Sequence, residues 1–519
     1  MPDIENTSTN DAPAKTRSGV PPLGKPVHLL SVFTLTMINV AAIATIRDLP
    51  AMAVYGLSSI FYCVAVALVF MIPISLVSAE LATGWPQRGG VYVWARQAFG
   101  MPWGFVAIWL QWIQNVVWYP MVLTFAAATL AYMIDPRLAT NPYYTVAMVL
   151  ALYWSATAVN LRGMKASGLI STIGVIIGTL APGVLVTLVG LYWLASGEPT
   201  TLHFTASSFM PDVTHIRTVV LALSALLTSF VGMEMSASHA EEVKNPSRDF
   251  PRAILFSTII ILGLAIAGTI GLAAIIPPGQ INPIHGFMQA IQKIEATFGV
   301  PGLVRVIAAL VTFGLFAQVT TWIPGPSKGI LAVSRHGYLP PWFHRVNKNN
   351  VQVHILLFQG GVVTILALMP LVMNMVDAYV LLMSIAAELY LTMYIIMFAA
   401  ALRLRYKQPD VKRAYRVPGP NAVMWFVCLL AIGGALFSIG AFYAPPSGAN
   451  PWIHVGVLLA GLVILGGAPL LIHRFQRPSW QTDDDAHLTA DRFRQKPSRG
   501  FADNRGSHTA GWPKGSPSG

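Results

Sequence analysis

The sequence predicts an all-α membrane protein with twelve transmembrane helices, and three observations support this fold class. Hydrophobic residues make up 55% of the 519 residues and charged residues only 10%, whereas a soluble domain carries about 25% charged residues. Apolar runs of about 20 residues, the length that crosses a bilayer, recur along the chain. The basic residues gather in alternate loops between these runs, which is typical of membrane proteins with a fixed orientation.

The apolar runs define one helical domain with two polar ends. A twelve-helix domain covers 28–475, between an N-terminal arm at 1–27 and a C-terminal tail at 476–519. The Ser, Gly, Pro and charged content of both ends predicts disorder. The twelve spans are expected at 28–50, 55–80, 102–134, 142–161, 167–195, 217–239, 252–276, 302–323, 351–371, 376–402, 421–443 and 452–473.

The distribution of basic residues predicts the orientation of the chain. With a cytoplasmic N-terminus, 28 of the 33 Lys and Arg residues lie in the arm, the even-numbered loops and the tail, and five lie on the outer side. This asymmetry predicts that both termini are cytoplasmic. It also accounts for the net charge of +12 without nucleic acid as a partner. The basic loop Arg403–Arg416 is either a topology anchor or a contact for anionic lipid headgroups.

The sequence contains no recognisable catalytic or metal-binding motif. The two cysteines, Cys63 and Cys428, lie in apolar runs and are expected to pack as small hydrophobic residues. The 12 histidines show no metal-ligand spacing. We therefore expect no enzyme activity, no cofactor and no metal, and no feature of the sequence sets an oligomeric state.

Two spans contain residues that interrupt a helix. The first carries Arg47, Asp48 and Pro50, and the sixth carries Gly232 and Glu234. These are the first spans of two five-helix halves, and matched interruptions in two halves indicate a substrate site at the bilayer midplane. A broken helix offers N–H groups to a carboxylate and C=O groups to an ammonium, as an amino acid requires. An ordinary kink explains the same residues.

The ionisable residues in these two spans have structural and functional explanations, and the sequence leaves both open. A bare carboxylate at membrane depth costs at least about 2.5–3.5 kcal/mol, so Glu234 should be paired, protonated or in contact with water. It either bonds a neighbouring helix or contacts substrate, with proton coupling as a further role for Glu234 and Asp48. Arg47 and Asp48 either neutralise each other or place a cation that attracts a substrate carboxylate.

Four polar or aromatic residues form pairs at helical spacing in the eighth and tenth spans. Gln318 and Trp322 are four residues apart, as are Tyr390 and Tyr394, so each pair shares a helix face. In the third span, Gln114 belongs to a polar stripe that should face other helices rather than lipid. Gln114 serves either the helical core or the substrate.

Four long motifs carry a resemblance to a known family. They are SFVGMEMSASHAEEVKNPSRDFPRA at 229–253, IPISLVSAELATGWPQRGGVYVWARQAFG at 72–100, WIPGPSKGILAVSRHGYLPPWFHRVNKN at 322–349 and RYKQPDVKRAYRVPGP at 405–420. In consistent order, these motifs resemble the bacterial glutamate/GABA antiporter family of the amino acid–polyamine–organocation superfamily. The resemblance covers about 28–475.

This resemblance implies a leucine-transporter-type fold and secondary transport. Two inverted five-helix repeats, about 28–196 and 217–402, would be followed by helices 11 and 12 at about 421–473. The family works by alternating access, with substrate between helices 1, 3, 6, 8 and 10. We expect a multi-pass antiporter of the bacterial inner membrane whose partners are membrane lipid and an amino acid or its decarboxylated amine. Proton-coupled symport and, on the same fold, an amino-acid-sensing receptor are the alternatives.

The resemblance assigns substrate contact to Trp322, Tyr390 and Tyr394, which match the family, and to the position of Gln318. There the family carries Glu, so this chain has lost a charge. Glu388 is an acid at a position where a member of that family has an apolar residue. It either bonds a neighbouring helix or takes part in proton coupling. The family closes its cytoplasmic path with a folded C-terminal segment, which the tail here does not match.

Overall fold

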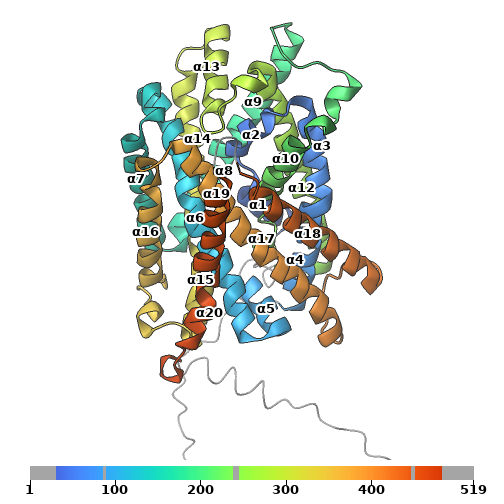
Figure 1. Cartoon of the computed structure of the whole chain (residues 1–519), viewed down its shortest axis with the longest axis vertical. Helices are drawn as coiled ribbons and strands as arrows, with labels where there is room; N and C mark the ends of the chain where they lie inside the picture. Colours follow the sequence, from blue (N-terminus) through green and yellow to red (C-terminus); the bar gives the residue numbers. More distant parts are fainter. Residues whose placement is uncertain (1–30, 86–88, 238–242, 244, 446–449, 482–519) are drawn as a thin grey trace, which may run out of the picture. The chain divides into compact units, whose positions relative to one another are not determined.

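The computed structural model describes residues 31–85, 89–237, 243, 245–445 and 450–481, and Figure 1 shows its helices. Within these ranges the secondary structure is helical apart from isolated β-bridges. The predicted arm at 1–27 lies outside the described residues, as does the tail from residue 482. The all-α prediction is confirmed for the part of the chain that is described.

The number and position of the spans also agree with the sequence. Eleven described helices are long and apolar enough to cross a membrane, and the bent pair Val32–Ile43 and Ile46–Ala53 makes twelve if it counts as one span. The fourth span, Pro142–Leu161, begins and ends where the sequence predicts. The eighth continues past its predicted end to Arg335, because a second helix starts at Pro324 in line with the first. The protein is therefore a multi-pass membrane protein.

The chain forms two compact units that do not follow the two halves of the sequence. Unit 1 contains Met1–Trp94, Gly183–Ile281 and Phe398–Ser438, and unit 2 contains the remaining segments. Spans 1 and 2 of the first half thus join the corresponding spans 6 and 7 in unit 1. Spans 3 and 4 join spans 8 and 9 in unit 2. Grouping of equivalent spans is expected when two halves share one architecture.

Unit 1 is organised around one long helix, α12 (Pro246–Ile275). Four helices of the first half pack on it: α1 (Val32–Ile43), α2 (Leu49–Ala53), α3 (Ser59–Val66) and α4 (Ile72–Gly84). The Asn39 amide of α1 donates a hydrogen bond of 3.2 Å to the Ser257 hydroxyl of α12. This buried polar contact fixes α1 against α12, because an unbonded amide in an apolar core would be costly.

The second broken span belongs to the same unit. It consists of α10 (Ile216–Ser229) and α11 (Glu234–Ala237). The first of these helices packs on α3, and the second packs on α1 and α4. Unit 1 also contains α18 (Asn421–Phe442) up to Ser438 and the last residues of α17 (Met375–Lys407).

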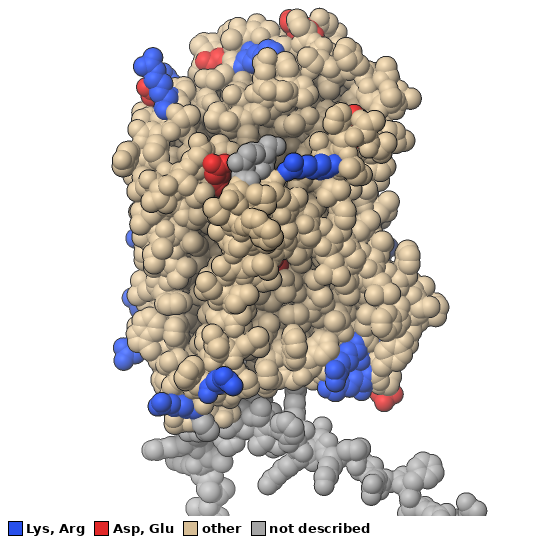
Figure 2. All heavy atoms as spheres, in the orientation of Figure 1, with Lys and Arg blue, Asp and Glu red and all other residues tan. Residues whose placement is uncertain are grey.

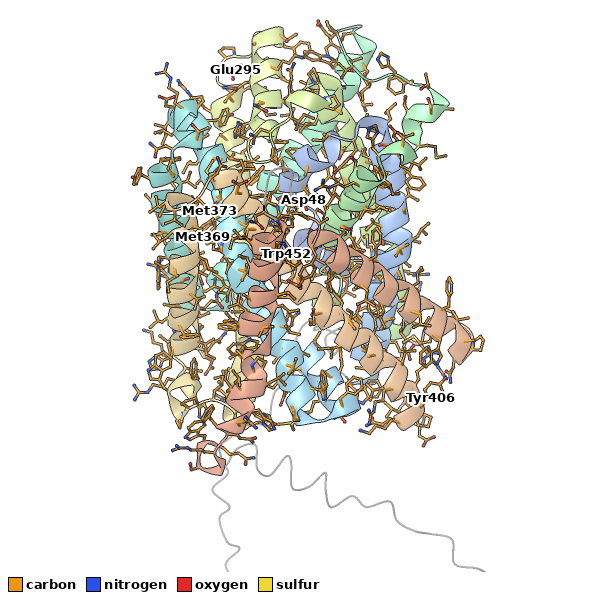
Figure 3. All side chains as sticks on the ribbon, in the orientation of Figure 1. Asp48, Glu295, Met369, Met373, Tyr406 and Trp452 are labelled. Carbon is orange, nitrogen blue, oxygen red and sulfur yellow. The ribbon has the colours of Figure 1, made fainter. Side chains whose placement is uncertain are left out.

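The basic loop is folded onto the end of α4, which the sequence did not reveal. Arg405 donates from Nε to Glu80 Oε1 at 2.9 Å and from Nη2 to Oε2 at 2.5 Å. The Val417 N–H donates to Oε2 at 2.8 Å, and Arg413 Nε lies 3.5 Å from Oε1. Two of the loop's arginines therefore neutralise a buried acid, while Lys412 and others stay exposed. Figure 2 shows basic side chains gathered at the lower right, near Tyr406 in Figure 3.

Unit 2 is built on close contact between α6 (Met101–Ile134) and α14 (Leu303–Trp322), which lie side by side in Figure 1. On another side, α14 packs against α8 (Met164–Val175) and its continuation Ile176–Leu180. A β-carbon on Gly178 would lie 2.4 Å from Gly314 Cα. The two helices can approach this closely only because both positions lack a side chain.

Smaller helices complete unit 2. They are α5 (Val91–Phe99, mostly in this unit), α7 (Pro142–Leu161), α13 (Gly286–Phe298), α15 (Pro324–Arg335), α16 (Val353–Ala367), α19 (Pro451–Gly461) with Leu462–Gly466, and α20 (Gly467–Arg474). A segment beyond α20 belongs to the predicted tail. The Arg477 guanidinium lies 5.5 Å from the Trp480 ring centroid, and Gln481 forms an isolated bridge with His336. The first residues of the tail are thus attached to the end of α15.

Candidate functional site

The first candidate site lies at the break between α1 and α2. Ala44 and Thr45 are extended, with ψ of 122° and 136°, so the α-helix stops at Ile43. The chain resumes with the short turn Ile46–Asp48, and Pro50 lies in the first turn of α2. The axis bends by 41° across this break. The last carbonyl groups of α1 are left without the partners that a continuous helix would supply.

The second break follows α10 and depends on Gly232. The α-helix ends at Ser229, and Gly232 has φ of 113°, a value that side chains with a β-carbon rarely adopt. The predicted interruption at this position is therefore present. Both broken spans are interrupted within unit 1. The C-terminal ends of α1 and α10 therefore lie close to one part of α12.

A small hollow of about 20 Å³ joins these two breaks. Its walls come from Ile43, Ala44, Thr45, Asp48, Leu49 and Met52 of the first break, Ser229 and Phe230 of the second, and Ile261, Leu264 and Ala265 of α12. A space of this size admits one water-sized group. The lining is apolar except for Thr45, Ser229, Asp48 and the backbone at the two breaks, which makes any polar group there a selective contact.

Asp48 is the acid of this hollow, and Figure 3 labels it at the turn into α2. Its Oδ1 accepts from Arg47, with Nε and Nη2 each 2.7 Å away. The predicted pairing of these neighbours is therefore present. Asp48 Oδ2 is buried and has no hydrogen-bond partner among the described residues. One carboxylate oxygen is therefore neutralised by Arg47, and the residue as a whole borders the hollow.

Glu234 opens α11 and is 3% exposed. Its helix packs against α1 and α4, so the acid lies among helices rather than in lipid. Both explanations for Glu234, helix packing and substrate contact, remain compatible with this position.

In unit 2, the predicted aromatic residues are all buried. Tyr390 and Tyr394 on α17 have ring centroids 4.8 Å apart, so they share one face as their spacing predicts. Trp322 on α14 lies 6.0 Å, centroid to centroid, from Trp118 on α6. Trp322 Nε1 is buried without a partner among the described residues. An unbonded indole N–H is costly, and a ligand or water would relieve that cost.

The predicted glutamines are buried in the same unit. Gln318 on α14 is 6% exposed and Gln114 on α6 is 5% exposed. Gln114 Oε1 is a buried acceptor without a partner within the described ranges. The unsatisfied buried polar atoms on the described parts of α6 and α14 are Gln114 Oε1, Asn115 Oδ1 and Trp322 Nε1, and two of these belong to residues that the sequence singles out. Trp118 lies four residues after Gln114 on α6, so the two side chains share a helix face.

The surroundings of Glu388 could not be found from sequence. Its carboxyl is 1% exposed and accepts a short hydrogen bond from the Tyr443 hydroxyl, which follows α18. Tyr443 is 55 residues away, and nothing in its sequence context marks it as a partner. Among the described residues there is also no cluster of three or more His, Cys, Asp or Glu that would hold a metal.

Two broken helices around a small hollow with a few polar groups, in an apolar bundle of eleven or twelve spans among the described residues, indicate a secondary transporter. The comparisons with known proteins agree. Residues 30–468 match the family model described as amino acid permease, so the chain belongs to the amino acid permease family. This family lies in the superfamily that the sequence motifs resemble, and it consists of transporters rather than enzymes.

Individual relatives cover nearly the whole domain. An uncharacterised transporter of Legionella pneumophila is 40% identical over 447 residues, 85% of this chain and 96% of its own length. A glutamate/gamma-aminobutyrate antiporter of Lactococcus lactis is 27% identical over 86% of this chain and 90% of its own length. A probable agmatine/putrescine antiporter of the same species is 24% identical over 76% of this chain and 83% of its own.

Proposed function

We propose that this protein is an amino-acid antiporter of the bacterial inner membrane. It exchanges one amino acid, or the amine formed by its decarboxylation, for another by alternating access. The observation that carries the proposal is the hollow at the two helix breaks in unit 1. The antiporters among the relatives are consistent with this mode of transport.

The electrostatics of the hollow favour an ammonium group. Both helices that stop there, α1 and α10, present their C-terminal ends. Such an end carries about half a negative charge, from the dipoles of the aligned peptides. Asp48 Oδ2 adds a carboxylate oxygen. An ammonium group is about the size of a water molecule, so a hollow of about 20 Å³ admits it.

The remaining substrate contacts are assigned to the residues that the sequence singled out. In unit 1 these are Gly232 and Glu234 at the second break and Arg47 at the first. In unit 2 they are Gln114, Gln318, Trp322, Tyr390 and Tyr394. The rings supply apolar area and attract cations, and the amide of Gln318 can donate to a substrate carboxylate without adding charge. A neutral residue at Gln318 favours a substrate other than glutamate or GABA.

The mechanism follows from these assignments. Spans 1 and 6 contribute the backbone of the breaks, and spans 3, 8 and 10 contribute side chains. The basic residues of the alternate loops support a cytoplasmic position for both termini. The exposed apolar residues of the spans, such as Phe426 and Val463, contact lipid.

Counterflow in proteoliposomes tests the proposal. The purified protein is reconstituted with one unlabelled amino acid inside, and a panel of labelled amino acids and amines is offered outside. Uptake that requires the internal substrate supports antiport, whereas a sensing receptor gives no exchange with any member of the panel. Absence of counterflow across the panel contradicts the proposal.

Asp48→Asn tests the ammonium site. The variant keeps the shape of the side chain and removes the charge, so uptake should fall about 10–100-fold, the range expected for a lost charged hydrogen bond. Asp135→Asn is the matched control, because Asp135 lies in a loop outside the spans. Equal uptake by Asp48→Asn and the control would remove Asp48 from the site.

Proton-coupled symport is the alternative function, and Glu388 favours it. Symport predicts uptake into liposomes that contain no amino acid, driven by an inward proton gradient and abolished by a protonophore. Antiport predicts no net uptake under those conditions.

A further inference from the structure

We propose that Glu388 is a proton-binding site, occupied in this conformation, and that it exchanges its proton with water during transport. The exchange of the proton during transport rests on the proposed transport function. The state of the carboxyl can be tested without transport.

Glu388 lies deep in the membrane span. It is 13 residues from the start of α17, a helix of 33 residues, so it is roughly 20 Å along the helix axis. The hydrocarbon core of a bilayer is about 30 Å thick. The side chain is 1% exposed. Water therefore does not solvate the carboxyl in this conformation.

The contacts of the carboxyl fit the protonated form. Oε1 accepts a hydrogen bond from the Tyr443 hydroxyl, and Oε2 has no partner among the described residues. Within those residues no Lys, Arg or His forms an ion pair with Glu388. A charged carboxylate with one neutral donor costs several kcal/mol at this depth, and protonation removes the cost. Glu80 shows the contrast, because two arginines neutralise it.

Glu388 lies on a different face of α17 from the tyrosine pair. Tyr390 is two residues further along, about 200° around the helix. Ile385 and Leu389 approach the backbone of Gly461 and Gly466, with side-chain carbons 3.3 Å and 3.1 Å from where their β-carbons would be. The Glu388 side of α17 is therefore the side that packs on the last helices. The proton acts through this packing rather than by touching the substrate.

Two other ionisable groups lie near the site. Tyr443, the hydrogen-bond partner, is partly exposed. His454 of α19 bonds the carbonyl of Phe442 through Nε2 at 2.9 Å, one residue before Tyr443. No other ionisable side chain occurs on α19 or on the 462–466 turn. Because Tyr443 contacts the carboxyl and is partly exposed, the proton of Glu388 is expected to reach water on the side of Tyr443. Deprotonation moves the proton from the carboxyl to water and leaves a carboxylate that accepts from the Tyr443 hydroxyl.

Infrared spectroscopy tests the occupied state. Wild-type protein in lipid and Glu388→Gln are compared at pH 7, and their difference spectrum is expected to show the carbonyl stretch of a protonated carboxylic acid. Glutamine keeps the oxygen that accepts from Tyr443, so the variant should fold. Other buried acids are common to both samples and cancel. A difference spectrum without that band overturns the inference, whatever the transport result.

Proton movement tests the coupling. Liposomes that carry a pH-sensitive dye and unlabelled exchange substrate inside are exposed to the substrate identified by counterflow. Wild type is expected to move protons with substrate, and Glu388→Gln is expected to keep counterflow and lose proton movement and pH dependence. Asp377→Asn, an exposed acid on the same helix, should behave as wild type.

Two further variants separate Glu388 from its neighbours. Tyr443→Phe should shift the pH at which the rate changes without abolishing the change, because the carboxyl remains. His454→Gln should leave the profile in place. If pH dependence disappears in His454→Gln and survives in Glu388→Gln, or if Glu388→Gln still moves protons, the inference is wrong. Absence of counterflow in wild type would instead contradict the proposed function.

Discussion

Substitutions of two tyrosines on α17 can distinguish a role in substrate binding from a role in helix packing. Tyr390 and Tyr394 are both buried and their rings touch. Tyr390→Phe retains the ring and Tyr390→Ala removes it. If the ring contacts substrate, the alanine variant should lose at least about tenfold in uptake, because an aromatic contact contributes about 1 kcal/mol beyond its buried area. Uptake per folded protein checks this, with folded protein measured by size-exclusion chromatography.

A parallel loss of folded protein and uptake in Tyr390→Ala would favour a packing role. The phenylalanine variant then reports on the hydroxyl alone. Tyr394 is 0% exposed, so the same substitutions there should cost more stability and serve as the comparison.

The neutral amide of Gln318 gives the second residue-level prediction. Gln318 is 6% exposed on α14, and Gln318→Glu restores the acid of the glutamate/GABA antiporter family. Burial disfavours the charged form of a carboxyl, so the introduced acid can take up a proton in mildly acidic buffer. The variant should therefore gain a change in rate or substrate preference in mildly acidic buffer, which uptake across a pH series measures. An unchanged substrate and pH profile would show that Gln318 does not set selectivity.

Helix contacts supply a prediction about the α8–α14 interface. A β-carbon on Gly314 would lie 2.6 Å from the backbone C and O of Gly178. Because these are backbone atoms, one of the two helices would have to shift to make room for it. Gly314→Ala should cost about 1–3 kcal/mol, the usual effect of overpacking. A lower Tm in detergent measures it. Gly361→Ala on α16 is the control, since nothing lies within 4 Å of its β-carbon position.

The control should be neutral or slightly stabilising, because alanine favours a helix more than glycine by about 1 kcal/mol. Equal melting temperatures for the two variants would show that the α8–α14 contact tolerates expansion.

The ion pairs of Glu80 with Arg405 and Arg413 attach the loop after α17 to the end of α4. Arg405→Ala leaves a buried carboxylate with weaker compensation, so we expect a loss of about 3–5 kcal/mol. The loop 408–420 should also become sensitive to protease. Lys412→Ala, at an exposed position, should change neither property. A combined Glu80→Gln and Arg405→Ala variant should recover part of the loss, and an additive double mutant would refute the pairing.

Across the whole molecule, the fold was predictable because membrane spans are coded locally. Each needs about 20 apolar residues in sequence, so runs such as 142–161 could be read directly. The helix breaks were also local, since Pro50 and Gly232 restrict or free the backbone where they stand. The grouping of spans 1, 2, 6 and 7 into one unit involves segments far apart in the chain, and composition does not record it.

The polar contacts of the candidate sites were less predictable for the same reason. Arg47 and Asp48 are neighbours in sequence, and mutual neutralisation was one of the two explanations that the sequence offered for them. Glu80 and Glu388 find partners 325 and 55 residues away, at Arg405 and Tyr443. An acid inside a span signals that some partner or proton must exist, but only the tertiary structure supplies its identity.

The C-terminal tail gives a prediction for the full chain. Residues 476–481 include the turn Pro478–Trp480 and the bridge from Gln481 to His336 on unit 2, so the segment that follows begins beside the end of α15. Residues 482–519 are rich in Gly, Ser, Pro and charge, a composition that predicts disorder. Their six basic and five acidic side chains leave a net charge of +1, so we expect basic loops on the same side of the membrane to repel them weakly.

We therefore predict that this tail does not plug the cytoplasmic path at neutral pH. Deleting residues after Gln481 should leave uptake at pH 7 within about twofold of wild type, because a disordered segment contributes little to a closed state. A second deletion, after Arg474, also removes the attached turn, so the two truncations separate the turn from the free tail. His487 and His508 gain charge near pH 6, which increases the repulsion, so acid should not create gating either. A large gain in neutral-pH uptake on the first deletion would establish that the tail gates transport.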